Sequence, residues 1–175
     1  GAAIVGYRKR YLEKLKTKIP DIYGGISDCR EKMTAEYAAT AGDDSESFKK
    51  ALFAARKNDV ILGSTSIGPH RDDIKIDIDG ISARSFGSQG QKRSAALSLK
   101  LGESEVFYEI TGKKPVLLLD DVLSELDKHR QNYLLDSIHD IQTMITCTGL
   151  DEFVNHRFSI NRVFRVVEGA VYSGN

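Results

Sequence analysis

The sequence has no long apolar run and few cysteines. No apolar stretch approaches the ~20 residues that a helix needs to cross a membrane, and residues 1–20 lack the apolar core of a signal peptide. We therefore expect a cytoplasmic protein without a membrane partner. Cys29 and Cys147 lie far apart, and neither has a cysteine or histidine at metal-ligand spacing. We expect both to be reduced thiols, with Cys147 in a buried strand.

Net charge is also missing, because 25 lysines and arginines balance 25 aspartates and glutamates. The composition therefore gives no global sign of nucleic-acid binding. Residues 1–20 are nevertheless locally basic, and their apolar side chains recur at helical spacing, which predicts an amphipathic helix over residues 2–18 that Pro20 ends. Its polar face is either simply solvated or contacts DNA phosphates. The residues that would make such contacts are Arg8, Lys9, Arg10 and Lys14.

The sequence contains no Gly-x-x-x-x-Gly-Lys-Ser/Thr, the loop that cradles nucleotide phosphates. Residues 116–119 nevertheless form an apolar run that ends in Asp120 and Asp121. A run buried on both faces is typical of a central parallel strand, and open α/β sheets bind ligands at the carboxyl ends of such strands. One carboxylate there can hold magnesium through water, and a second can orient or deprotonate the attacking water. The run alone is equally consistent with a solvated acidic turn or with the acid pocket of a phospho-acceptor domain.

A glycine-bearing turn precedes a long predicted helix. Ser88, Gln89, Gly90 and Gln91 stand before about six helical turns, which Gly112 and then Pro115 close. A hydroxyl and free backbone N–H groups at a helix N-terminus form an anion site, which the helix dipole strengthens. Taken alone, the tetrapeptide favours an ordinary serine N-cap without a ligand.

The order of these features is that of the ABC-type ATPases: signature turn, helix, strand ending in acids, and D-loop. The sequences Gly-Pro-His-Arg-Asp-Asp at residues 68–73, Ser-Gln-Gly-Gln-Lys-Arg-Ser at residues 88–94 and Leu-Leu-Asp-Asp-Val-Leu-Ser-Glu-Leu-Asp at residues 118–127 resemble the RecF family of bacterial DNA repair proteins. The resemblance covers most of the chain from about residue 59 onward. It implies that the phosphate-binding loop belongs to an absent amino-terminal half. We therefore expect a carboxyl-terminal fragment that does not hydrolyse ATP by itself.

The resemblance implies an α/β fold, the carboxyl-terminal lobe of an ABC/SMC-type P-loop ATPase. Residues 58–175 would form the lobe, and residues 1–57 would supply the end of a helical arm and its return to the sheet. The implied cofactors are ATP and Mg²⁺. ATP held by one subunit would be capped by the signature turn of another, and the residues that would contact the nucleotide in trans are Ser88, Gln89, Gly90, Gln91 and Asp127.

The resemblance also assigns roles around the acids. Asp120 would hold magnesium through water, and Asp121 would act on the attacking water. ABC transporters carry a histidine that senses the γ-phosphate after the next strand, and this chain offers only the hydroxyl of Thr148 or Thr146. Thr148 is the candidate switch, and the missing histidine argues against a transporter. Arg71 is expected to pair with a phosphate or with an acid.

The implied function is that of an ATP-dependent homodimer on DNA. It would recognise gaps or single-strand/double-strand junctions and recruit recombination mediator proteins in recombinational repair, replication restart and the SOS response. One alternative is an architectural lobe that binds proteins and no longer engages nucleotide. A phospho-acceptor domain using Asp120 is the other alternative, but it explains neither residues 88–91 nor Asp127.

The remaining segments are predicted from local signals. The pattern of residues 32–37 fits either a helix or a strand, and the resemblance favours a strand there. Helices are predicted from Asp43 or Asp44 to about Lys57, with a capping box between Asp43 and Glu46, and again after Asp127. The other expectations are a loop at 21–27, a strand at 60–67, hairpins at 74–86 and 164–172, and a β-rich run at 142–148.

Overall fold

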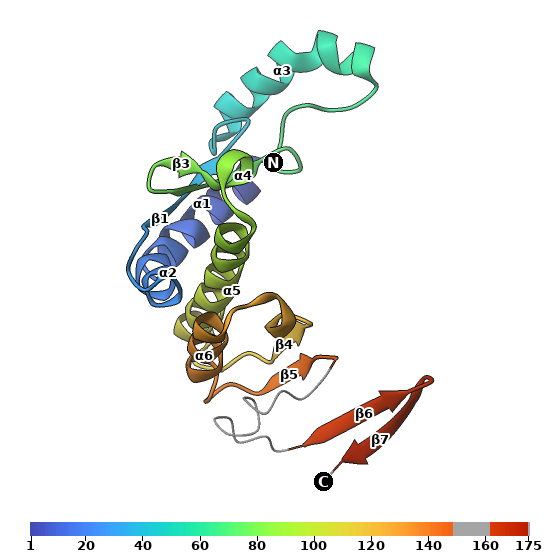
Figure 1. Ribbon diagram of the computed structural model, residues 1–175. Coiled ribbons are helices and arrows are strands. Elements are labelled where there is room, and N and C mark those ends of the chain that lie inside the picture. The colour runs from blue at the N-terminus through green and yellow to red at the C-terminus, as the bar shows by residue number, and fades with distance from the viewer. Residues whose placement is uncertain (149–161, 175) are drawn as a thin grey trace. The chain divides into compact units, whose positions relative to one another are not determined.

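The computed structural model describes residues 1–148 and 162–174 (Figure 1). The chain folds as two units, Gly1–Pro115 and Val116–Asn175, each with its own internal contacts. The expected boundary after residue 57 falls within a helix of the first unit. The division into an arm segment over residues 1–57 and an ATPase lobe over residues 58–175 stays a prediction.

The first unit begins with two helices, α1 (Ala2–Lys16) and α2 (Ile19–Ser27). The loop expected at residues 21–27 is therefore wrong. The expectation that Pro20 ends the first helix is also wrong, since α1 ends at Lys16 and Pro20 lies in the first turn of α2. A proline in the first helical turn needs no N–H, and its fixed φ suits the helix. The glycines of α2 are outweighed by a buried stripe at helical spacing, which consists of Ile19, Ile22, Tyr23 and Ile26.

A three-stranded antiparallel sheet follows, in the order β1 (Met33–Ala38), β2 (Asp73–Ile78) and β3 (Ile81–Ser82). The strand favoured at residues 32–37 is confirmed. The hairpin is also confirmed, and both of its turn residues, Asp79 and Gly80, have positive φ, as the tight turn requires. Its return strand is only two residues long, because α4 (Ala83–Phe86) begins directly after it.

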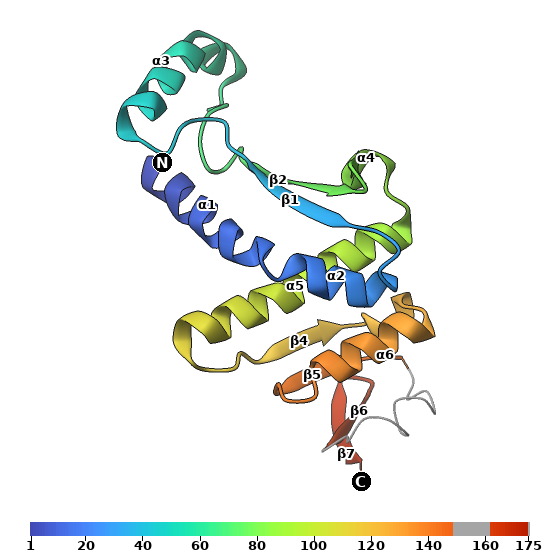
Figure 2. The same ribbon diagram turned by 90° about the vertical axis from the view of Figure 1, so that its left-hand side faces the viewer.

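Helix α3 (Ser45–Leu62) projects away from this sheet, and none of its residues is buried (Figures 1 and 2). Its N-cap is Asp44, whose carboxylate accepts hydrogen bonds from the Glu46 and Ser47 amides. The capping box expected between Asp43 and Glu46 is therefore wrong. The strand expected at residues 60–67 is wrong too, since α3 continues until Gly63, with φ of 65°, ends it as a left-handed cap.

Helix α5 (Gln89–Thr111) runs along α1 and α2 (Figure 2). Its length of about six turns is confirmed. A Cβ on Gly102 would lie 2.8 Å from Leu15 Cδ1, so this glycine allows α1 and α5 to approach closely. The core of the first unit joins these helices to the sheet through Leu12, Leu15, Ile19, Tyr23, Met33, Ala35, Ile78, Ala83, Ala95 and Val106.

The second unit contains β4 (Leu117–Asp120), the short helix η1 (Leu123–Glu125), α6 (Lys128–Ser137) and β5 (Thr143–Thr146). Strands β4 and β5 are parallel and are joined through α6, as parallel pairing requires. A second pair, β6 (Val163–Val167) and β7 (Ala170–Gly174), forms the expected terminal hairpin.

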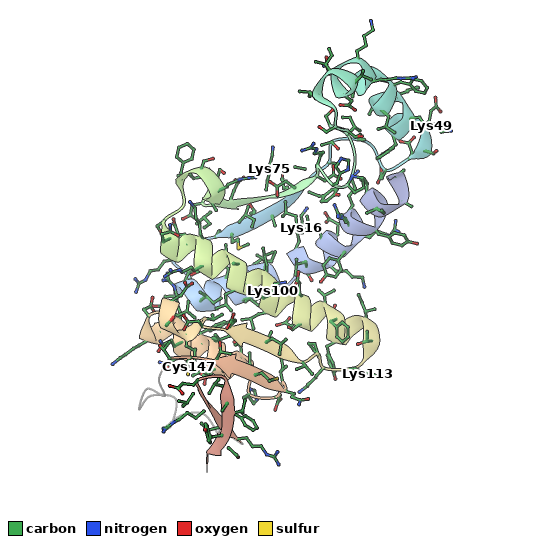
Figure 3. All side chains as sticks on the ribbon, turned by 90° about the vertical axis from the view of Figure 1, so that its right-hand side faces the viewer. Lys16, Lys49, Lys75, Lys100, Lys113 and Cys147 are labelled. Carbon is green, nitrogen blue, oxygen red and sulfur yellow. The ribbon has the colours of Figure 1, made fainter. Side chains whose placement is uncertain are left out.

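Two expectations about the second unit are wrong. Strand β4 is not buried on both faces, since Leu118 is 69% exposed and its neighbour Met144 on β5 is 63% exposed. Within the described residues β4 pairs with β5 alone. Cys147 follows the end of β5 and is exposed rather than buried (Figure 3).

In residues 1–148 and 162–174, no helix combines the length and the apolar character that a bilayer span needs.

Candidate functional site

The turn before α5 is closed by a reciprocal pair of hydrogen bonds. Ser88 Oγ accepts from the Gln91 amide at 3.1 Å, and Gln91 Oε1 accepts from the Ser88 amide at 2.8 Å. This capping box satisfies two backbone donors and stabilises the helix start by about 1 kcal/mol. The amides of Gln89 and Gly90 donate no hydrogen bond within the described residues, as expected for a first helical turn. These two amides are what the turn can offer to an anion.

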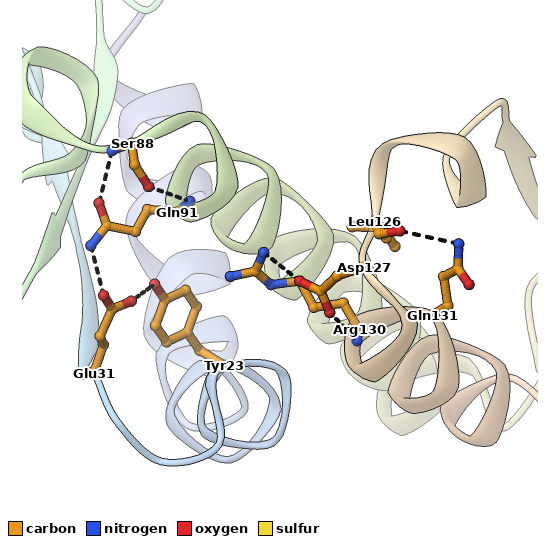
Figure 4. A network of polar contacts seen from close by, with 8 residues as sticks. All are labelled: Tyr23, Glu31, Ser88, Gln91, Leu126, Asp127, Arg130 and Gln131. Atoms are coloured by element: carbon orange, nitrogen blue, oxygen red, sulfur yellow. Dashed lines mark hydrogen bonds and ion pairs between the residues drawn. The ribbon is translucent and has the colours of Figure 1, made fainter.

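Two neighbours fix the shape of the turn. A Cβ on Gly87 would lie 2.5 Å from the Ala83 carbonyl oxygen, so α4 and the turn approach too closely for any larger residue. On the other side, Gln91 Nε2 donates to Glu31 Oε1 at 2.7 Å, and Tyr23 OH donates to Glu31 Oε2 at 2.8 Å (Figure 4). The turn is therefore held by both α4 and the segment between α2 and β1.

The two acids lie at the carboxyl end of β4, beside the end of β5. Thr146 is in register with Asp120, and its hydroxyl donates to Asp120 Oδ1 at 2.5 Å. The Thr146 hydroxyl oxygen in turn accepts from the Asp121 amide at 3.0 Å. Asp121 has a left-handed backbone with φ of 51°, which aspartate tolerates better than most residues. One threonine thus contacts both acids, and both carboxylates are exposed.

Asp127 has a local structural role. It is the N-cap of α6, where Oδ1 accepts from the Arg130 amide and Oδ2 accepts from Arg130 Nη1, each at 3.0 Å (Figure 4). The hydrogen bond from the Arg130 amide lowers the pKa of Asp127, against the opposing effect of partial burial. Gln131 Nε2 donates to the carbonyls of Leu123 and Leu126 and so holds the segment before the cap.

In residues 68–73, the Asp72 side chain contacts residues of other segments. Its carboxylate accepts from Tyr37 OH and from both the amide and the hydroxyl of Thr40. Burial acts to raise the pKa of Asp72, but these hydrogen bonds and the nearby Arg8 charge outweigh it, and the pKa is lowered. Asp72 therefore ties this loop to the end of β1. Arg71 donates to the Thr65 carbonyl and the Ser64 hydroxyl, which are contacts within its own loop.

The basic residues of α1 fall into two groups. Arg8 donates to the Pro69 carbonyl, and Lys9 pairs with Asp43 at 3.3 Å, so both hold other segments of the first unit. The Arg10 guanidinium stacks over the Tyr7 ring at 4.8 Å, and Lys14 is exposed. Arg10 and Lys14 are therefore better placed than the other two to meet phosphates.

Comparison with known proteins places this geometry in a family. No family model matches the chain. The DNA replication and repair protein RecF of Agathobacter rectalis is 48% identical over 171 residues, which are 98% of this chain and 47% of that protein. RecF of Lachnoclostridium phytofermentans is 45% identical over 174 residues, which are 99% of this chain and 48% of that protein. The chain belongs to the RecF family.

A solved structure supports the same assignment. It is described as the recombination mediator protein RecF-ATP in the RecFOR pathway, and this chain matches it with a TM-score of 0.79 and 38% identity. The match covers all of this chain and 47% of that one. The predicted α/β fold of an ABC/SMC-type ATPase is thereby confirmed. The chain spans about half the length of the RecF relatives it matches.

The chain carries oxygen donors that suit magnesium. Asp120 and Asp121 offer exposed carboxylates beside the Thr146 hydroxyl, and Mg²⁺ prefers such ligands, often through water. Within the described residues no group of three or more acids, histidines or cysteines forms a metal cage. Magnesium is commonly bound by one or two carboxylates together with substrate phosphates, so Asp120 fits the predicted role.

Thr146 was predicted only as the alternative to Thr148 for the switch, and Glu31 and Tyr37 were not among the predicted site residues. Thr146 contacts both acids, whereas the predicted switch Thr148 is exposed beyond β5. Glu31 and Tyr37 contact residues 60 and 35 positions away in the chain. The order of motifs identified the acids and the turn, but no local signal marks such distant partners.

Proposed function

We propose that this chain supplies the nucleotide-capping turn and the acidic pair of a RecF-type ATPase. The observation that carries the proposal is the opening of α5, where a capping box leaves the Gln89 and Gly90 amides available at the positive end of a helix. A triphosphate bound to one copy would be capped by this turn in a second copy. The Ser88 hydroxyl and the Gly90 amide would then contact the γ-phosphate.

The acidic pair would act on the same nucleotide from the other side. Asp120 would hold magnesium through water, and a magnesium ion bound there would supply positive charge beside the phosphates. Asp121 orients or deprotonates the attacking water, and the Thr146 hydroxyl keeps Asp120 and the Asp121 backbone together. Transporters usually carry glutamate at the second acid. Aspartate is one methylene shorter, so we expect slow hydrolysis that suits a clamp or a timer.

ATP-dependent pairing would control DNA binding. Arg10 and Lys14 on α1 provide exposed positive charge for phosphates, as expected for sequence-independent binding. The DNA partner is a gap or a single-strand/double-strand junction, and the paired protein recruits recombination mediators. Support comes from relatives that are DNA replication and repair proteins, one of them described as a recombination mediator.

A purely architectural lobe is the second candidate, and particular contacts favour it. Asp127 caps α6, Arg71 bonds to its own loop, and Gln91 bonds to Glu31, so all three are engaged within the chain. In that case the lobe would keep these contacts for stability and would bind proteins without nucleotide.

One pair of variants separates the two candidates. Ser88→Arg places a large cation in the capping turn, and Asp44→Arg makes a matched change at the N-cap of α3, which lies outside the candidate site. Magnesium-dependent ATP binding and dimerisation are measured in the full-length protein. A nucleotide-capping lobe predicts ATP-dependent dimers in the parent and in Asp44→Arg but not in Ser88→Arg. An architectural lobe predicts no ATP-dependent dimer in any of the three.

A further inference from the structure

One carboxylate joins the turn that opens α5 to the helical start of the chain. Glu31 lies between α2 and β1, and it accepts from Gln91 Nε2 on one side and from Tyr23 OH on the other (Figure 4). Tyr23 is only 1% exposed, so its hydroxyl is carried by a ring fixed in the core. Glu31 is therefore anchored to the core and in turn anchors Gln91.

This contact sets the orientation of the Gln91 amide. The two ends of a glutamine amide have opposite hydrogen-bonding character, one donating and one accepting. Because Nε2 faces the Glu31 carboxylate, Oε1 faces the Ser88 amide and accepts its hydrogen bond. A reversed amide would direct two donors at each other and an oxygen at the carboxylate. Glu31 thus selects the one orientation in which the capping box closes.

We propose that Glu31 is a positioning residue for the nucleotide-capping turn, acting through Gln91 with Tyr23 as its anchor. This inference rests on the proposed function of the turn. The Gln89 and Gly90 amides bind an anion most tightly if they are fixed beforehand, since ordering a loop on binding costs affinity. A displacement of the segment between α2 and β1 would reach the turn through the contact between Glu31 and Gln91.

Two variants of Glu31 and one matched control test the inference in the full-length protein. Glu31→Ala deletes both hydrogen bonds. Glu31→Gln can keep both, because its oxygen accepts from Gln91 and its amide can donate to the Tyr23 oxygen. Asp44→Ala also deletes a carboxylate that accepts hydrogen bonds, here from two backbone amides and the Ser47 hydroxyl at the start of α3.

Two readouts are needed. Amide hydrogen exchange at Ser88 reports on the closed turn without nucleotide, and the ATP concentration for half-maximal dimerisation reports on its use. We expect Glu31→Ala to speed exchange at Ser88 about fivefold, the change for one net hydrogen bond, and to raise the required ATP concentration by about the same factor. Glu31→Gln should restore both values. Asp44→Ala should lower the Tm without changing either readout.

Unchanged exchange at Ser88 in Glu31→Ala would overturn the inference. Faster exchange with an unaltered ATP requirement would also overturn it, because Glu31 would then stabilise the fold and nothing more. If the parent protein does not dimerise with ATP, the proposed function fails separately. The exchange measurement alone then decides whether Glu31 fixes the turn.

Discussion

Replacing Asp121 with asparagine separates the chemistry of the acidic pair from its structure. Asp121 has a left-handed backbone, which asparagine also tolerates. Backbone atoms make the contacts that place it, since its amide donates to Thr146 and its carbonyl accepts from Ser124 Oγ. Asp121→Asn therefore keeps these contacts while removing the carboxylate that would act on water.

Asp121→Asn should leave the stability nearly unchanged and reduce ATP turnover strongly. We expect the free energy of unfolding to change by no more than about 0.5 kcal/mol, as for an exposed substitution that disturbs no packing. ATP turnover by the full-length protein should fall by about 10²- to 10⁴-fold, the contribution of a positioned general base. Asp121→Ala is the structural control, and it should also lose stability because alanine tolerates positive φ less well.

Steady-state hydrolysis and thermal unfolding measure these two effects side by side. Full turnover by Asp121→Asn would refute the role assigned to the carboxylate. A fall in turnover matched by a large loss of stability would refute the claim that backbone contacts alone place this residue.

Three further predictions concern single residues. Thr146→Val removes the hydroxyl bonded to Asp120 and should slow ATP turnover by about 10- to 100-fold, whereas Thr146→Ser should keep turnover near the parent rate. Because the folded pKa of Asp72 lies below its unfolded value of 3.8, its stabilising contribution is complete above that value and is lost as the pH falls through the folded pKa. Thermal unfolding between about pH 5 and about pH 2.5 should therefore show a smaller acid loss for Asp72→Asn than for the parent, and equal losses would contradict this. Lys14→Gln should reduce the slope of log affinity for DNA against log salt by about 1. Lys113→Gln removes the same charge elsewhere and is the control. A slope for Lys14→Gln that equals the slope for Lys113→Gln would contradict a phosphate contact.

Elements with strong local signals could be predicted from the sequence. The alternation of residues 74–78 and the turn at Asp79 and Gly80 indicate a hairpin without reference to the rest of the chain. Ser88 and Gly112 likewise mark the two ends of α5. Such signals arise from backbone conformation and capping, which depend on a few neighbouring residues.

The wrong secondary-structure predictions lie in segments whose structure is determined by packing or by a cap several residues away. Gly24 and Gly25 suggest a loop, yet the buried stripe that includes Ile22 and Ile26 makes the segment helical. Residues 60–62 have strand-forming side chains, but α3 is already propagating and ends only at Gly63. In both segments tertiary or helical context overrides local propensity.

The candidate site likewise contains residues that the sequence could identify and contacts that it could not. Asp120, Asp121 and the turn at residues 88–91 could be predicted because their spacing and order are visible in the sequence. The Glu31 contact could not, because it joins residues 60 positions apart. The choice of Thr146 over Thr148 also depends on strand register, which places Thr146 beside Asp120.

The central claim is that the turn of one copy and the acids of another act on one nucleotide, and mixing two inactive variants tests it most directly. Full-length Ser88→Arg lacks a working turn and full-length Asp121→Asn lacks a working acid. In a mixed dimer, one of the two composite sites has both parts intact. We predict that the equimolar mixture hydrolyses ATP well above the average of the two variants alone, and at up to about half of the parent rate where every dimer is mixed, because each mixed dimer has one intact site of two. A mixture no more active than the average of the two variants alone would contradict the claim.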